Sequence, residues 1–130
     1  MLAPLGLISA LRNSFRNQSR GWWEEFDVSL ADQEFVLTEN RRGKPPIVAR
    51  IPWNSVAIVC FVDGGQGSDC FYLLAADNSK LAMVPAEASG GLAFWEELKA
   101  RNLFPAEISG QAVRSTTQGA RLWWPPQHGR

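Results

Sequence analysis

The chain has little of what catalytic and metal-binding sites are built from. Its 130 residues contain one histidine, His128, and two cysteines, Cys60 and Cys70. A structural zinc site takes more nitrogen and sulfur ligands than these residues supply. No serine, histidine and aspartate stand in a recognisable triad pattern, and no pair of acid–base groups converges. We therefore predict a protein that is not an enzyme and has no metal, no disulfide and no other cofactor.

The chain also lacks an excess of charge of one sign, because its 13 basic side chains balance its 13 acidic ones. A neutral chain has no overall attraction for phosphate backbones, so we predict no nucleic acid partner. Its apolar runs fall well short of the roughly 20 residues that a membrane-spanning helix needs. With 45% hydrophobic residues, a chain of this length is expected to form one packed domain.

Residues 1–20 are predicted to form an amphipathic helix and a linker. Ile8, Leu11 and Phe15 recur at helical spacing, with arginines beside them. The positive charges follow the apolar run, which is the reverse of their order in a secretory signal. We therefore expect a cytoplasmic protein with reduced cysteines.

Residues 21–104 have the pattern of a β domain closed by one helix. A central hairpin is predicted from strands at 55–63 and 69–76, joined by a glycine-rich turn at 64–67. Further strands are predicted at 22–30, 34–38, 47–51 and 80–84, the last after a turn at Asp77-Asn78.

The central hairpin is apolar on both faces. In its first strand, Ile58, Cys60 and Val62 share one face, and Val59 and Phe61 share the other. A half-exposed strand would alternate with polar residues. We therefore predict that both faces are covered, the second by the N-terminal helix or by another copy of the chain in a homodimer.

The clearest helix is predicted at 91–102, with Leu92, Trp95 and Leu98 on one stripe, Phe94 beside it, and a left-handed stop at Asn102. Residues 105–130 are interpreted as a tail rich in tryptophan and proline, which is weakly patterned until the segment 121–126.

The order of strands followed by one helix resembles the pleckstrin-homology-like barrel, including its bacterial and GRAM-type relatives. The segment Ile51-Pro52-Trp53-Asn54-Ser55-Val56-Ala57-Ile58-Val59 is similar to the start of a middle strand of that fold. The resemblance implies a mainly β (α+β) class, with a partly closed antiparallel barrel of about six to seven strands and a C-terminal helix. It also implies a binding scaffold.

In family members that bind phosphoinositides, basic residues surround the first hairpin. Here that turn, 31–34, is acidic, and Arg41, Arg42 and Lys44 lie in the next loop. These three residues form a candidate loop for an anionic ligand, with a solvated loop as the alternative interpretation.

Four of the six tryptophans stand in two adjacent pairs, Trp22-Trp23 and Trp123-Trp124. If these segments are extended, each pair presents one ring inward and one outward. The outward rings are either covered within the domain or form a surface for a protein partner.

The leading hypothesis is a non-enzymatic, cytoplasmic module that binds a protein partner. The first alternative is peripheral attachment to a membrane through the N-terminal helix and the 41–44 loop. The second alternative is a small molecule bound in the barrel cavity.

Overall fold

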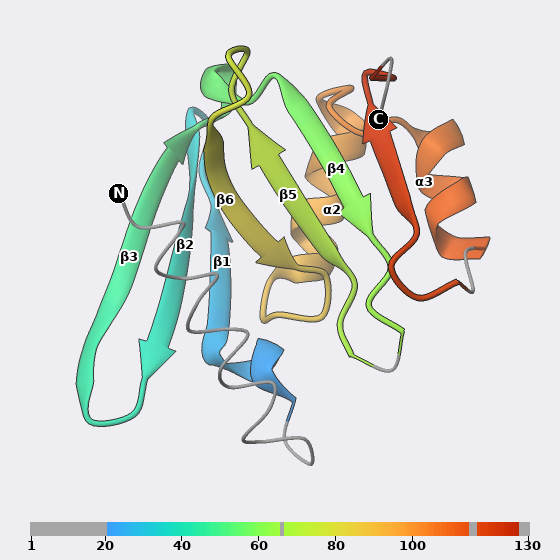
Figure 1. Cartoon of the computed structure of the whole chain (residues 1–130). Coiled ribbons are helices and arrows are strands. Elements are labelled where there is room, and N and C mark those ends of the chain that lie inside the picture. Colours follow the sequence, from blue (N-terminus) through green and yellow to red (C-terminus); the bar gives the residue numbers. More distant parts are fainter. Residues whose placement is uncertain (1–20, 66, 115–116, 128–130) are drawn as a thin grey trace.

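The computed structural model describes residues 21–65, 67–114 and 117–127. Within these ranges the chain forms seven strands in two antiparallel sheets, together with two α-helices and two short 3-10 helices (Figure 1). The mainly β class predicted from the sequence is confirmed. The N-terminal helix expected within residues 1–20 and His128 both lie outside the described residues.

The first sheet is a meander of β1 (Phe26–Leu30), β2 (Glu34–Arg41) and β3 (Lys44–Pro52), in that order. Its strands confirm those predicted at 34–38 and 47–51, and both run further than predicted. The loop predicted to contain Arg41, Arg42 and Lys44 is therefore a tight turn between the two strands. Gly43 adopts a φ of 71° there, which glycine tolerates without strain.

Trp22 and Trp23 do not belong to a strand, so the strand predicted at 22–30 is wrong over its first four residues. They begin the 3-10 helix η1 (Trp22–Glu25), which follows Gly21 at a φ of 74°. The ring of Trp22 packs edge-on against those of Trp23 and Phe26, with centroids 6.1 and 6.0 Å away. Residues 22–25 thus form a turn of helix stabilised by aromatic packing, where an extended strand was predicted.

The second sheet has the order β6-β5-β4-β7. The predicted central hairpin is confirmed as β4 (Ile58–Val62) and β5 (Cys70–Leu74), and both strands are shorter than predicted. Strand β6 (Lys80–Pro85) follows the predicted turn, in which Asn78 has a φ of 69°. The fourth strand, β7 (Arg121–Trp124), was not predicted. It lies in the segment interpreted as a tail and pairs antiparallel with β4.

The two sheets are separate hydrogen-bonded units and do not close into one barrel. The 3-10 helix η2 (Trp53–Ser55) connects β3 to β4, so the segment 51–59 spans a strand end, a turn and the next strand. A parallel bridge between Asp27 and Ser89 brings β1 close to the segment after β6.

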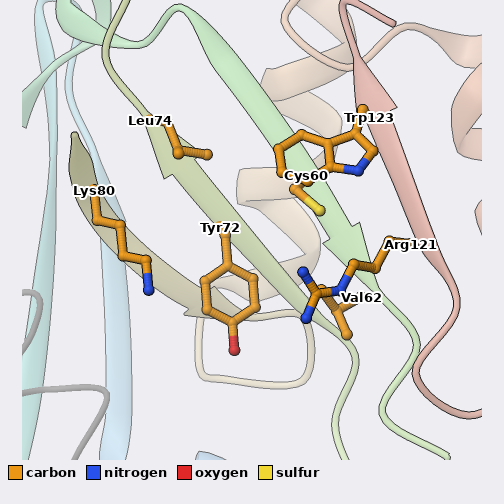
Figure 2. Close-up of a pocket in the computed structure, with 7 residues that line it drawn as sticks. All are labelled: Cys60, Val62, Tyr72, Leu74, Lys80, Arg121 and Trp123. Atoms are coloured by element: carbon orange, nitrogen blue, oxygen red, sulfur yellow. The ribbon is translucent and has the colours of Figure 1, made fainter. Parts of the chain in front are cut away.

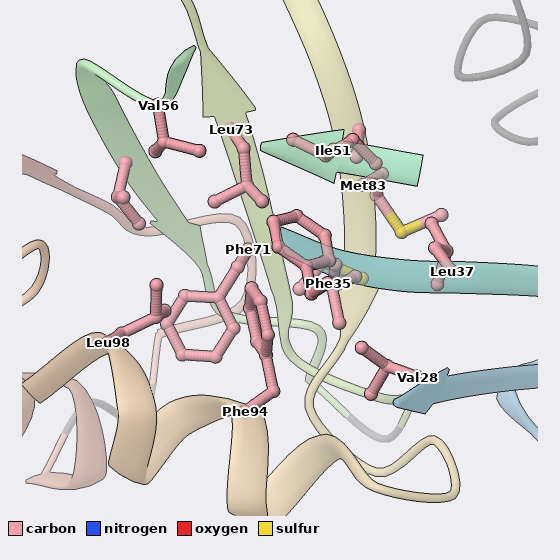
Figure 3. Packing of buried hydrophobic residues seen from close by; sticks show 14 of the residues in the cluster. Val28, Phe35, Leu37, Ile51, Val56, Phe71, Leu73, Met83, Phe94 and Leu98 are labelled. Atoms are coloured by element: carbon pink, nitrogen blue, oxygen red, sulfur yellow. The ribbon is translucent and has the colours of Figure 1, made fainter. Parts of the chain in front are cut away.

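Aromatic rings fill the core between the sheets and helix α2 (Gly91–Ala100) (Figure 3). The ring of Phe94 lies 5.0 Å from that of Phe35 and 6.1 Å from that of Phe71. The two-sided apolarity of the hairpin and the helix stripe predict six buried residues. Trp95 is half-buried and packs against the core, and the other five are buried: Ile58, Val59, Phe61, Phe71 and Leu73.

The buried stripe of α2 differs from the predicted one. Leu92 is 72% exposed, and the inward positions are Gly91, Phe94 and Leu98. These three recur at three- and four-residue spacing. The observed stripe therefore keeps Leu98 and has Gly91 and Phe94 in place of Leu92 and Trp95. Asn102 adopts a φ of 59° just after the helix, which confirms the predicted left-handed stop.

Helix α3 (Ala106–Arg114) lies in the segment interpreted as a tail. The indole Nε1–H of Trp95 donates a hydrogen bond to Ser109 Oγ at 3.0 Å, and Ser109 Oγ donates to the Phe104 carbonyl at 3.1 Å. A buried polar contact with α2 thus positions α3, and β7 follows it. A hydrophobic pattern cannot reveal such a contact.

Candidate functional site

A pocket with a volume of about 190 Å³ opens on the face of the second sheet that points away from α2 (Figure 2). We call it the outer-face pocket. All four strands of the sheet contribute to it. Its lining residues are Cys60, Val62, Tyr72, Leu74, Lys80, Arg121 and Trp123.

The strand register brings these side chains together. Cys60 on β4 lies opposite Tyr72 on β5 and Trp123 on β7, so the three form one row across the sheet. Val62 lies opposite Arg121 in the next row on the same face. The alternate residues of each strand point to the core, because successive side chains in a strand face opposite sides.

The pocket has an apolar floor and a cationic rim. Cys60 is 2% exposed and Leu74 is also buried, whereas Tyr72 and Trp123 are half-buried. Lys80 and Arg121 are exposed, and none of the lining residues is acidic. The pocket therefore favours a ligand that has an apolar part for the floor and a negatively charged part for the rim.

Tyr72 is the central polar group. Figure 2 shows its ring between the side chains of Lys80 and Arg121. Burial raises the pKa of Tyr72 above its ordinary value of 10.0, Cys70 raises it further, and Arg121 acts in the opposite direction. The phenol is therefore protonated at neutral pH and can donate a hydrogen bond to an acceptor in the pocket.

The environment of Cys70 disfavours a nucleophilic thiolate. Cys60 and Cys70 are both buried, and burial together with Asp69 raises the pKa of Cys70 to about 12. The reactive form of cysteine is the thiolate, which this environment suppresses. The two residues are not cross-strand partners, since Cys60 faces Tyr72 and Cys70 faces Val62.

The four predicted surface tryptophans lie in different environments. Trp123 lines the outer-face pocket, and Trp124 packs against the core from the other face of β7. The inward–outward prediction is thus confirmed for this pair. Trp22 and Trp23 pack against each other beside the glycine turn, where Gly67 lies close to both rings. The four rings do not form one surface.

Arg41, Arg42 and Lys44 lie at the tip of the β2–β3 hairpin, which belongs to the other sheet (Figure 1). The Arg41 guanidinium donates from Nε and Nη2 to the Pro45 carbonyl, at 3.2 and 2.7 Å. Arg41 is thus held within its own hairpin. Arg42 and Lys44 are exposed on either side of Gly43.

Sequence reasoning singled out Trp123 but missed the other pocket residues. The signal for part of the site was present, because the two-sided apolarity of β4 and β5 predicted a second face that needs a cover. Lys80 and Arg121 carried no such signal. They reach the pocket only through the pairing of β6 with β5 and of β7 with β4.

No family model, no curated protein and no solved structure matches this chain. In the described part of the chain, no group of three or more His, Cys, Asp or Glu residues is placed to hold a metal ion. No helix within those ranges has both the length and the apolar character to cross a membrane.

Proposed function

We propose that this chain is a non-enzymatic, cytoplasmic module that recognises a protein partner through the outer-face pocket. The observation that carries the proposal is the combination of Tyr72, Trp123 and Arg121 around one apolar depression. Tyrosine, tryptophan and arginine are the residues most enriched at the energetic centres of protein interfaces.

The size of the pocket favours part of a protein over a whole metabolite. Sites that enclose drug-sized molecules typically have volumes of about 300–1,000 Å³, and this one has about 190 Å³. It can hold one side chain of a partner protein while the rest of that partner contacts the surrounding surface of the sheet. The alternative of a small molecule between the sheets stays a prediction, and aromatic rings occupy much of that region.

We also propose that the domain is a variant of the pleckstrin-homology-like fold. Six strands in two antiparallel sheets followed by helix α2 support this proposal. The position of β7, which follows both helices and pairs with β4, departs from that pattern.

Capture of partners from the source cell tests the proposed function. The tagged parent chain is compared with Trp123→Ala and Tyr72→Ala, and with Leu92→Ala as a matched control because Leu92 is exposed on α2. We expect at least one partner that the parent and the control retain and that both pocket variants lose. A partner profile that is identical for all four proteins would overturn the proposal.

A second copy of the chain is the simplest alternative occupant. Size-exclusion chromatography with light scattering gives the mass of the parent and of Trp123→Ala. A dimer that dissociates in the variant would identify the partner as another copy, joined through an isologous interface.

The β2–β3 tip supports a second candidate function, attachment to an anionic membrane. Arg42 and Lys44 are exposed there, at the end of a two-stranded arm. Each basic residue near such a surface contributes about 1 kcal/mol of binding free energy. Co-sedimentation with phosphatidylserine vesicles should then decrease for Arg42→Gln with Lys44→Gln. Equal sedimentation of parent and variant would remove this candidate.

A further inference from the structure

We propose that the partner segment held by the outer-face pocket is acidic, with an Asp or Glu carboxylate between Lys80 and Arg121 and an apolar neighbour against Trp123. This inference rests on the proposed function and names the chemistry of its ligand. Three independent features of the pocket support it: its charge, its hydrogen-bonding capacity and its size.

The first feature is uncompensated positive charge. Three other cations of the chain, Arg50, Lys99 and Arg101, form ion pairs with neighbouring glutamates. Within residues 21–65, 67–114 and 117–127, neither Lys80 nor Arg121 takes part in an ion pair. Both cations border one pocket whose lining contains no carboxylate, so a ligand carboxylate supplies the missing charge.

The second feature is the phenol of Tyr72, whose ring lies between the side chains of Lys80 and Arg121 (Figure 2). As the phenol is protonated at neutral pH, it donates a hydrogen bond to a carboxylate oxygen and does not repel it. A cationic ligand would meet two like charges here and is therefore rejected.

The third feature is the size and apolar floor of the pocket. The floor is formed by Cys60, Leu74 and Val62, with the Trp123 ring beside it. A volume of about 190 Å³ suits one or two side chains of an extended peptide. An apolar residue next to the carboxylate would contact the Trp123 ring, which is the type of contact that carries most interface energy.

Binding of labelled peptides tests the proposal. The probes are three fluorescein-labelled octapeptides in which leucine alternates with glutamate, with glutamine or with lysine, and the readout is fluorescence anisotropy at low salt. We expect the parent to bind the glutamate peptide most tightly. Lys80→Gln and Arg121→Gln should each weaken it about two- to five-fold, and together about ten-fold. Added salt should weaken it further.

The matched control is Arg42→Gln with Lys44→Gln, which removes the same charge from the other sheet. It should leave the affinity for the glutamate peptide unchanged. Equal affinity for the glutamate and glutamine peptides, or an equal loss in the pocket and control variants, would overturn the proposal. Complete displacement of the peptide by free glutamate at millimolar concentration would also overturn it, because a free acid would then be the ligand.

Two further outcomes separate this inference from the proposed function. A captured partner that is lost with Trp123→Ala but retained with Lys80→Gln and Arg121→Gln would overturn the acidic ligand and leave the pocket function intact. Binding to phosphatidylserine vesicles that requires Lys80 and Arg121, in the absence of peptide binding, would overturn the acidic peptide in favour of a lipid headgroup.

Discussion

The two hairpins β2–β3 and β4–β5 bury their side chains in different ways. Along β2, buried residues alternate with half-buried ones, and along β3 most residues are exposed. In β4 and β5 all but one residue of each strand is buried. The first hairpin covers the core with one face, as expected for a sheet whose other face meets water. The second is buried on both faces.

Position in the sheet explains part of this difference. β3 is an outermost strand of the first sheet, whereas β4 and β5 have neighbours on both sides. Trp123 of β7 adds cover on the outer face, which the sequence prediction of a helix or a second copy did not include. The comparison teaches that apolarity on both faces marked the outer-face pocket as well as the core.

Removal of a core ring from the second hairpin should give the largest effect. Phe71 is 0% exposed and contacts the rings of Phe61, Phe94, Trp95 and Phe104. Phe71→Ala should lower the free energy of unfolding by about 3–5 kcal/mol, because it leaves a cavity that the surrounding rings cannot fill. Urea denaturation followed by tryptophan fluorescence measures this change.

The control for that prediction is Val48→Ala on the first hairpin, where the side chain is 40% exposed. Its effect should stay within about 0.5 kcal/mol. If the two variants lost equal stability, the difference in burial between the two hairpins would not correspond to a difference in their contribution to stability.

The next effect is a loss of stability at high pH that depends on Cys70. Its pKa is about 12 in the folded chain against 9.0 for the free group. Between these values the unfolded chain releases the thiol proton and the folded chain retains it, so stability decreases as pH rises. The contribution is about 1.4 kcal/mol for each pH unit in that window.

Denaturation of the parent and of Cys70→Ala at pH 8, 9, 10 and 11 measures this contribution together with the smaller effect of Cys70 on the pKa of Tyr72. Above pH 9 we expect the free energy of unfolding of the parent to decrease more with pH than that of the variant. A difference that stays constant up to pH 11 would contradict the assignment to Cys70.

Much of the strand pattern could be predicted because it depends on local signals. The Gly64–Gly67 turn, the Asp77-Asn78 turn and the Asn102 stop each use residues that tolerate special backbone angles. In the structure, strands flank each of the two turns, and helix α2 ends just before Asn102. The 3-10 helix at Trp22 and helix α3 were missed because ring packing and a buried hydrogen bond decide them.

The candidate site was harder to predict than the fold. Its row Cys60–Tyr72–Trp123 joins three strands, and Trp123 is more than sixty residues from Cys60 in the printed sequence. Periodicity identifies which face a residue occupies but not which distant strand lies beside it. The pairing of β7 with β4 therefore had to come from the structure.

The two faces of β7 provide a smaller effect that sharpens the comparison. Trp124→Ala removes a ring packed against the core, whereas Trp123→Ala removes one that lines the outer pocket. Truncation of Trp124 should cost about 2 kcal/mol and that of Trp123 about 1 kcal/mol. Thermal denaturation of both variants measures the order. A larger loss of stability for Trp123→Ala than for Trp124→Ala would mean that the Trp123 ring contributes more to packing than the ring that faces the core.

The smallest effect concerns the surface of the first hairpin, where Arg50 on β3 pairs with Glu34 on β2. The Arg50 side chain is 67% exposed, so water and salt screen the pair. A double-mutant cycle with Arg50→Gln and Glu34→Gln should give a coupling free energy of about 0.2–1 kcal/mol that decreases in 1 M salt. A coupling above about 2 kcal/mol that persists in salt would mean that this face is desolvated. The contrast with the β4–β5 hairpin would then disappear, because both hairpins would be covered on two faces.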